Sequence, residues 1–301
     1  MSIESLNFIN NHIANNAFDY SKVKENSIIT LIDDNKEYDV NIIIGCRGRK
    51  EFIKPIIESF ERAIKFFPSK SFIITIVDHN TFPENKKFTK NRTNYIWSEG
   101  NVVEQYSRSF AYNFGVKYSN KSKYYLLHDL DILVKENFFE ELFENLKDKK
   151  CIQPYGGRRV LYMSKELTDS VLEKNLDYNS FSENTPGVTP PMYNGQLALG
   201  SKGGSIFIER ELFLEVGGFD PEIFWGYAAE DQFFWEKVNI ISEVAYADNP
   251  KIDMFHMWHP PSSNSNPLLH SMENIWIEFK NLSKEKKETI ITLKKYIYGK
   301  Y

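Results

Sequence analysis

Two aspartates one residue apart mark the first place in this sequence where metal chemistry can be expected. Asp129 and Asp131 follow the apolar run 124–128, which reads as a buried strand. In a turn at a strand end, both carboxylates can be directed toward one divalent cation. Such oxygen ligands suit Mn²⁺ or Mg²⁺, whose remaining positions the oxygens of a diphosphate can occupy. Two acids in an exposed turn are commonly only solvated, so the position after a strand is what favours a metal site.

Two histidines form a second candidate for metal binding. His256 and His259 lie three positions apart, downstream of Asp253, in a chain with six histidines. Imidazole nitrogen binds borderline metals such as Mn²⁺, so one of them can complete the aspartate site. A histidine beside Trp258 is more often a packed or surface residue. The pattern leaves open which histidine binds the metal.

Aromatic and small residues lead into two adjacent acids between positions 225 and 231. Trp225 and Tyr227 can stack on the apolar face of a sugar, and a carboxylate at Glu230 or Asp231 can accept the proton of an attacking hydroxyl. The plainer alternative is a helix that begins with two acids, which its positive N-terminal end favours. Glycine pairs at 203–204 and 217–218 favour the functional interpretation, because glycine lets the backbone approach a ligand closely.

The elements that must position these residues alternate along the chain. Short β-branched or apolar runs predict strands, and apolar residues at helical spacing predict helices. Strands are expected at 40–44, 71–77, 124–128 and 205–208, and helices at 52–64, about 103–118, 210–216 and 230–238. This order predicts an α/β fold with a Rossmann-like, mixed, mostly parallel sheet flanked by helices. Ligands of such sheets bind at the carboxyl ends of the strands.

One long segment departs from this alternation of strands and helices. Between about 156 and 204 the sequence is rich in Tyr, Ser, Asn, Pro and Gly, and Pro186, Pro190 and Pro191 interrupt regular structure. We expect a long irregular loop there, and a loop of that length in a compact domain is usually functional.

Composition limits the classes of protein to consider. The 301 residues are 42% hydrophobic and carry a net charge of −4, so the chain can bury a large core and has no global attraction for nucleic acid. Cys46 and Cys151 cannot form a disulfide framework. Neither a membrane-spanning stretch nor a signal peptide is recognisable, which predicts a cytoplasmic location.

We expect an N-terminal helical extension over 1–38, with a helix near 6–13, then a catalytic domain over 39–270.

The final segment, 271–301, is expected to be a helical extension that is both basic and aromatic, with six lysines after position 281. It can pack on the domain or lie on the anionic inner face of a membrane. Two other classes of enzyme lack support. Residues 200–204 do not have the spacing of a phosphate-binding P-loop, which disfavours a kinase or nucleotide triphosphatase, and no nucleophile elbow is present, which disfavours a Ser–His–Asp hydrolase.

Taken in order, the motifs resemble the catalytic domain of β-1,4-galactosyltransferases and related bacterial chondroitin-type and polypeptide N-acetylgalactosaminyl transferases. Five blocks match between about residues 41 and 259, at 44–49, 108–115, 128–131, 203–231 and 256–259. The resemblance implies the glycosyltransferase A fold and a UDP-sugar donor held with Mn²⁺ or Mg²⁺.

The resemblance also implies roles for individual residues. The expected nucleotide-sugar site comprises Arg47, Arg49, Asp78, Arg108, Asn113, Asp129 and Gly204. The expected metal ligands are Asp131, His259, His256 and Asp129, with Asp131 preferred among the acids and His259 ranked slightly ahead of His256. Relatives differ in which of the two histidine positions they use.

For the chemical step, the resemblance makes Asp231 the catalytic base and assigns Glu230, Trp225 and Tyr227 to the acceptor. A single displacement implies inversion at the anomeric carbon. Segment 180–202 corresponds to a loop that closes over the bound donor. Tyr227 replaces a tryptophan of the family, Ala228 and Ala229 replace glycines, and Gln232 replaces an acid. These departures affect the choice of sugar and acceptor rather than the reaction class.

The leading expectation is therefore an inverting, metal-dependent transferase. It would move a hexose or N-acetylhexosamine from a UDP-sugar to a glycan or lipid-linked glycan in surface polysaccharide or glycoconjugate synthesis. A catalytically inactive nucleotide-sugar or carbohydrate-binding protein of the same fold is the alternative, although decay usually erases one of the acids that this chain keeps. A nucleotidyltransferase is disfavoured, because 45–49 is too short for its glycine-rich loop.

Overall fold

The architecture follows the alternation of strands and helices expected from the sequence. The computed structural model describes residues 19–33, 35–89, 93–99, 106–155, 160–174, 176–190, 192–193, 196–197, 203–224, 226, 228–247, 249–260 and 269–300. In these ranges the predicted strands and helices are confirmed, with ends shifted by a few residues. The predicted helix near residues 6–13 lies outside them.

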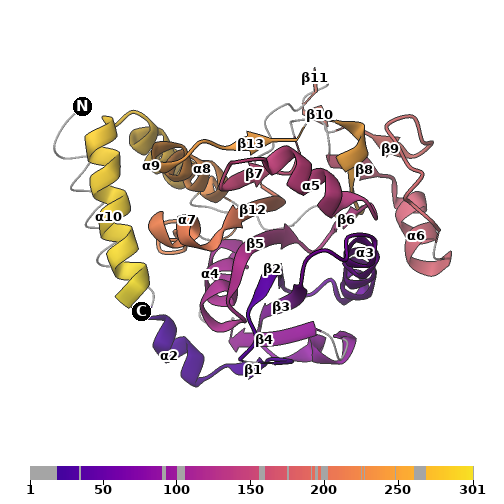
Figure 1. Cartoon of the computed structure of the whole chain (residues 1–301), viewed down its shortest axis with the longest axis horizontal. Helices are drawn as coiled ribbons and strands as arrows, with labels where there is room; N and C mark the ends of the chain where they lie inside the picture. Colours follow the sequence, from indigo (N-terminus) through magenta and orange to yellow (C-terminus); the bar gives the residue numbers. More distant parts are fainter. Residues whose placement is uncertain are drawn as a thin grey trace.

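A central sheet organises the molecule (Figure 1). Within the described residues it has eight strands, in the order β1 (Ile28–Thr30), β4 (Thr93–Glu99), β3 (Phe72–Asn80), β2 (Tyr38–Cys46), β5 (Ser122–Asp129), β12 (Ser205–Glu209), β7 (Cys151–Gln153) and β13 (Ala245–Tyr246). Strands β4, β3, β2 and β5 run parallel. Strand β12 runs antiparallel to β5, with Ser205 opposite His128. The start of β12 therefore lies beside the carboxyl end of β5.

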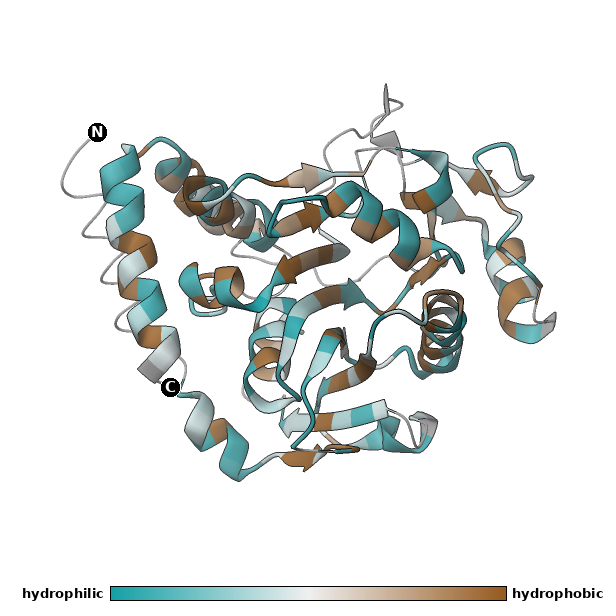
Figure 2. Ribbon diagram, in the orientation of Figure 1, coloured by the Kyte–Doolittle hydropathy of each residue, from teal (hydrophilic) through white to brown (hydrophobic). Residues whose placement is uncertain are grey.

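Helices cover both faces of this sheet because alternate strand residues point to opposite sides. Ile42 and Ile44 belong to a buried cluster with Phe60 of α3 (Ile53–Phe66) and with α5 (Phe138–Leu146). Ile43 points the other way, into a cluster with Phe114 of α4 (Arg108–Tyr118) and with α7 (Arg210–Glu215). The resulting hydrophobic segments recur along the central strands in Figure 2.

A smaller sheet lies beside the carboxyl end of β5. Its order is β6 (Ile132–Val134), β14 (Met254–His256), β8 (Val160–Met163) and β9 (Val188–Thr189). Helix α6 (Lys165–Lys174) follows β8, and β10 (Met192–Tyr193) pairs with β11 (Gln196–Leu197). The prediction of an irregular segment over 156–204 is therefore wrong for these elements. The prolines that motivated it begin only at Pro186, after β8 and α6, and Ser164 Oγ accepts the Leu167 N–H at the start of α6.

The two ends of the described chain meet over α4 (Figure 1). Helix α2 (Tyr20–Glu25) contributes Tyr20, whose ring lies 5.9 Å from that of Tyr298 in α10 (Lys284–Lys300). Ile290 and Ile297 of α10 pack with Phe279 of α9 (Leu269–Lys280) and Phe233 of α8 (Glu230–Ile241). Short 3-10 helices occur at Lys50–Phe52, Glu84–Phe88 and Pro250–Ile252. None of the helices in the described ranges combines the length and apolar character needed to cross a membrane.

Candidate metal centre and active site

Three side chains suited to binding a metal meet at the end of β5. Asp131, His256 and His259 each offer a ligand atom, and these atoms lie within 4.8 Å of one another. Asp131 lies in the turn between β5 and β6, and β14 pairs with β6 so that His256 is opposite Ile132. The Nε2 atoms of His256 and His259 lie 3.7 Å and 3.2 Å from the Asp131 carboxylate oxygens. One carboxylate and two imidazoles fit a borderline divalent metal such as Mn²⁺.

The electrostatics of this cluster keep the Asp131 carboxylate ionised. Burial raises the pKa of Asp131, but the hydrogen bond from His259 and the nearby His256 and Arg49 outweigh it and hold that pKa well below its usual range. The Arg49 guanidinium forms an ion pair with Asp131. The hydrogen bond with Asp131 raises the pKa of His259, whereas burial lowers the pKa of His256. Asp131 therefore stays ionised, with positive charge beside it.

Arg108 connects the acid at the end of β5 with the two acids at the start of α8. One guanidinium nitrogen lies 3.0 Å from Asp129, and the other lies 2.6 Å from Glu230 and 3.7 Å from Asp231. Ser107 positions Arg108, because its hydroxyl accepts the Phe110 N–H and caps α4. Residues over 120 positions apart in the sequence are thereby brought into one charged group.

The hydrogen-bond partners of the Asp129 carboxylate are Arg108 and Tyr112. Besides Arg108, it accepts a hydrogen bond of 2.9 Å from the Tyr112 hydroxyl. The metal-ligand cluster in the described part of the chain comprises Asp131, His256 and His259 and does not include Asp129. Tyr112 was missed by the sequence interpretation. Its position four residues after Arg108, on the same face of a helix, was an available signal.

The acids of α8 are buried and unusually easy to protonate. Burial raises the pKa of Glu230 to about 7, against the lowering effect of Arg108. Burial also raises the pKa of Asp231, again opposed by Arg108. A carboxylate with a raised pKa is a better proton acceptor near neutral pH than an ordinary surface acid.

The glycine pair before β12 lets the backbone pass between these groups. Gly204 has φ of +91°, and its carbonyl accepts the Asp129 N–H at 2.8 Å. A Cβ on Gly203 would lie 2.5 Å from Asp231 Oδ2 and 2.8 Å from both terminal nitrogens of Arg108. His128 ties this turn to its neighbours, since its ring nitrogens are hydrogen-bonded to Ser205 Oγ and the Ile132 carbonyl. Gly204 thus lies where the sequence places it, beside the acids.

Two other predicted residues are engaged inside the protein. Asp78, at the end of β3, is completely buried and accepts hydrogen bonds from the Tyr95 hydroxyl and Asn85 Nδ2 at 2.7 Å and 3.0 Å. Asn113 is also completely buried and exchanges hydrogen bonds with the backbone of Phe219. The polar atoms of both side chains are therefore engaged within the protein.

The remaining predicted residues differ in how far they can be placed. Arg47 and Arg49 follow β2, and both are partly buried. Trp225 and Tyr227 lie outside the described residues, as do residues 191, 194–195 and 198–202 of the predicted closing segment 180–202. The arrangement of the acceptor aromatics therefore stays a prediction.

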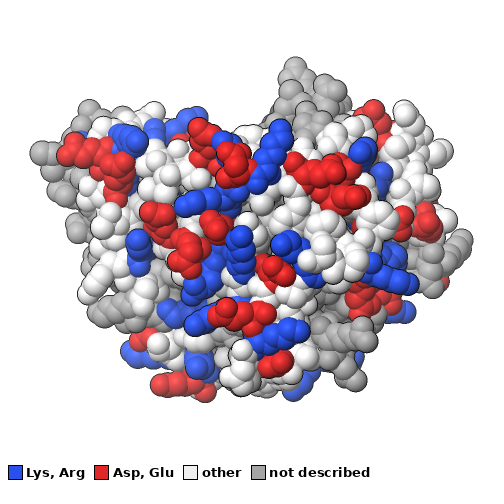
Figure 3. Space-filling view, viewed as in Figure 1, with Lys and Arg blue, Asp and Glu red and all other residues white. Residues whose placement is uncertain are grey.

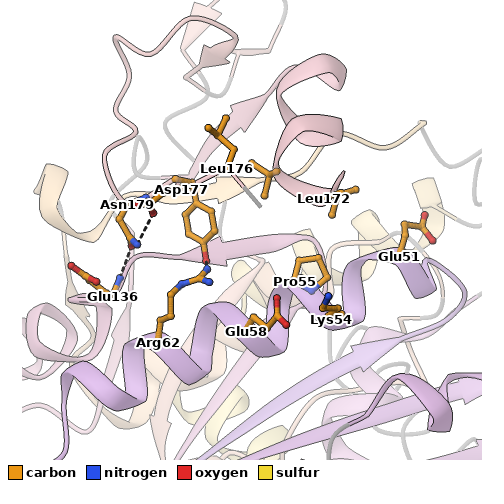
Figure 4. Close-up of a pocket in the computed structure, with 12 residues that line it drawn as sticks. Glu51, Lys54, Pro55, Glu58, Arg62, Glu136, Leu172, Leu176, Asp177 and Asn179 are labelled. Atoms are coloured by element: carbon orange, nitrogen blue, oxygen red, sulfur yellow. Dashed lines mark hydrogen bonds between the residues drawn. The ribbon is translucent and has the colours of Figure 1, made fainter. Parts of the chain in front are cut away.

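A separate cavity of about 430 Å³ lies between α3 and the turn after α6 (Figure 4). Arg62 projects from α3 to the Tyr178 hydroxyl, and Asn179 accepts the Glu136 N–H at 3.0 Å. None of the predicted catalytic, nucleotide or metal residues lines this cavity. Figure 3 shows acidic and basic side chains interspersed over one face of the molecule.

Comparisons with known proteins bear on the fold. No protein-family model matches the sequence, and no curated protein matches it either. Among solved structures, GalNAc-T7 with UDP, GalNAc and Mn²⁺ is similar with a TM-score of 0.53 and 14% identity, over 83% of this chain and 50% of that chain. The present chain thus spans half the length of that protein.

Two further structures are similar at lower TM-scores. The catalytic domain of Drosophila β1,4-galactosyltransferase 7 in complex with xylobiose has a TM-score of 0.48 and 14% identity, over 78% of this chain and 79% of that chain. The mannosyltransferase PcManGT from Pyrobaculum calidifontis, with GDP-Man and Mn²⁺, has a TM-score of 0.48 and 12% identity, over 98% of this chain and 81% of that chain. The sheet topology and the likeness to GalNAc-T7 establish the glycosyltransferase A fold for this chain.

Proposed function

We propose that this protein is an inverting, metal-dependent glycosyltransferase that moves a hexose or N-acetylhexosamine from a UDP-sugar to a hydroxyl of a glycan. One observation carries the proposal. The Asp131, His256 and His259 cluster lies at the end of the same strand as Asp129, which Arg108 links to Glu230 and Asp231. A candidate metal centre and two acids with raised pKa values therefore adjoin each other on a glycosyltransferase A fold.

Different residues of the chain would bind the metal, the donor and the acceptor. Asp131, His256 and His259 would hold Mn²⁺ or Mg²⁺, which neutralises the charge of a departing nucleoside diphosphate when bound. Arg47 and Arg49 would bind the diphosphate or uridine, within walls that Asp78, Asn113 and Gly204 support. Arg108 and Asp129 would border the donor sugar.

Asp231 is proposed as the base. It would take the proton of the acceptor hydroxyl as that oxygen attacks the anomeric carbon, while Glu230, Trp225 and Tyr227 hold the acceptor. A single attack from the face opposite the leaving diphosphate inverts the anomeric centre. The pKa of Asp231 is raised by burial, which suits this proton transfer near neutral pH.

Calorimetric titration with UDP, GDP, dTDP and CMP, each with and without Mn²⁺, tests the donor class. We expect UDP to bind only when Mn²⁺ is present. Binding of another nucleotide in preference to UDP would correct the donor class, and no nucleotide binding under any condition would contradict the proposed function.

We further propose a cytoplasmic role in assembling surface polysaccharide or glycoconjugate. Residues 39–270 would form the catalytic domain between the flanking segments 1–38 and 271–301, of which the first adds the edge strand β1 to the central sheet. A lipid-linked acceptor would place α10 near an anionic membrane, where Lys284 and Lys295 are exposed. Co-sedimentation with anionic and neutral vesicles tests this contact. The membrane contact is supported if the protein binds anionic vesicles and the double variant Lys284→Glu with Lys295→Glu does not. Equal binding to anionic and neutral vesicles would contradict it.

A further inference from the structure

The two histidines of the metal cluster are held in different ways. His259 Nδ1 is hydrogen-bonded to the carbonyl of Pro260 at 2.8 Å, which leaves Nε2 directed at Asp131. This is the usual arrangement, in which a hydrogen bond to one ring nitrogen orients the other nitrogen toward the metal. Neither ring nitrogen of His256 has a hydrogen bond to any residue in the described part of the chain. Another feature must therefore fix the plane of its ring.

A tyrosine ring supplies that feature. Tyr162 of β8 lies directly opposite His256 of β14 in the register of the parallel pair. Its ring stacks on the imidazole with centroids 4.6 Å apart and an angle of 30° between the planes. The centroid of the His259 ring lies 5.1 Å from that of His256, with an angle of 48° between the planes. Because stacking restricts rotation about the last side-chain bond of His256, it keeps Nε2 pointed at Asp131.

Tyr162 is exposed, unlike its neighbours in β8. The other three residues of β8 are buried, whereas Tyr162 is 40% exposed. A large aromatic side chain on the solvent side of a short strand contributes little to the core. The ring is partly covered by the imidazole of the candidate metal ligand His256, on which it stacks.

We propose that Tyr162 is a positioning residue that orients His256 for metal binding. The inference rests on the proposed function, because it takes the Asp131, His256 and His259 cluster to be the metal centre. Tyr162 does not itself contact the metal. Its effect passes through the imidazole, so it depends on the ring of Tyr162 and not on its hydroxyl.

Mn²⁺ binding to the full-length protein, without nucleotide, tests the inference. The electron paramagnetic resonance signal of free Mn²⁺ gives the dissociation constant. We expect Tyr162→Ala and Tyr162→Leu to weaken binding about 10-fold, in the range found when a residue that orients a metal ligand is removed. Tyr162→Phe keeps the ring and should bind within about 2-fold of the unmodified protein, since stacking needs only the ring. Tyr296→Ala, at a site 67% exposed on α10, is the matched control for loss of a surface tyrosine.

A double variant separates positioning from a general structural effect. If Tyr162 acts through His256, then Tyr162→Ala with His256→Ala should bind Mn²⁺ as His256→Ala alone does, because coupled residues are not additive. Additive losses would overturn the inference. So would Tyr162→Ala binding Mn²⁺ as tightly as the unmodified protein, and that result would leave the metal centre intact. Absence of Mn²⁺ binding by the unmodified protein would instead contradict the metal centre on which the proposed function depends.

Discussion

Lys294 of the C-terminal helix forms an ion pair with Glu222, and their side chains are 2% and 0% exposed. A second pair joins Lys237 of α8 to Asp220 at 2.5 Å, with both side chains almost completely buried. The turn that holds Asp220 and Glu222 leads directly into the segment ending at Glu230 and Asp231. The ion pair between Lys294 and Glu222 thus connects helix α10 to the part of the chain that carries the proposed base.

Removing the positive charge of Lys294 should destabilise the protein strongly. Lys294→Met leaves Glu222 buried without its closest cation, and breaking a buried pair in this way costs about 3–5 kcal/mol. Urea denaturation should show this loss in the free energy of unfolding. Lys295→Met, at an exposed neighbouring position, should change it by less than about 0.5 kcal/mol.

The partner substitution provides the control for this prediction. Glu222→Leu combined with Lys294→Met removes both charges and should recover most of the lost stability, since apolar replacements of buried pairs are often tolerated. A double variant as unstable as Lys294→Met alone would show that the loss does not come from the unpaired Glu222.

The raised pKa of Glu230 predicts a specific dependence of stability on pH. Its pKa is about 7 in the folded protein, raised by burial from an ordinary value of 4.5. The folded state therefore binds this proton more tightly, so the stability it contributes is complete below pH 4.5 and is lost as pH rises through 7. The free energy of unfolding, measured by urea denaturation, should fall from pH 5 to pH 8 in the unmodified protein. The fall should exceed that of Glu230→Gln by about 1 kcal/mol or more. A difference between the two proteins that stays constant with pH contradicts the prediction.

Much of the site could be predicted because the relevant signals are local. The β-branched run before Gly45 and the apolar run before Asp129 predict strands, and the parallel sheet then places the residues after them at one edge. The sequence does not show which histidine lies near Asp131, because the pairing of β14 with β6 is what brings both His256 and His259 close to it. That pairing joins segments more than 100 residues apart.

The C-terminal lysines show a different limit. By sequence they form a basic tail, yet Lys287 and Lys294 are 8% and 2% exposed. Glu222, which pairs with Lys294, lies 72 positions earlier in the chain. Charge counted along a segment cannot reveal a partner supplied by a distant turn.

Gly203→Ala should impair turnover without affecting the metal cluster. The added Cβ would displace Asp231 or Arg108, both of which are held by ion pairs. A displacement of about 1 Å at a reacting group can cost about 100-fold in rate. The turnover number for UDP-sugar hydrolysis should fall by about that factor, with Mn²⁺ affinity unchanged. Gly299→Ala, where a Cβ meets nothing within 4 Å, serves as the control. Equal turnover in the two variants would count against a role for the close packing of Gly203 against Asp231 and Arg108.

Metal binding and proton transfer can be separated by substituting Asp131 and Asp231 one at a time. Mn²⁺-dependent binding and hydrolysis of a panel of UDP-sugars should be measured for the unmodified protein, Asp131→Ala and Asp231→Asn. We expect Asp131→Ala to lose metal-dependent binding. Asp231→Asn should still bind the donor with Mn²⁺ but turn it over about 100-fold more slowly. If the unmodified protein neither binds nor hydrolyses any member of the panel, or if Asp231→Asn retains full turnover, the assignment of a metal-dependent transferase with Asp231 as its base is contradicted.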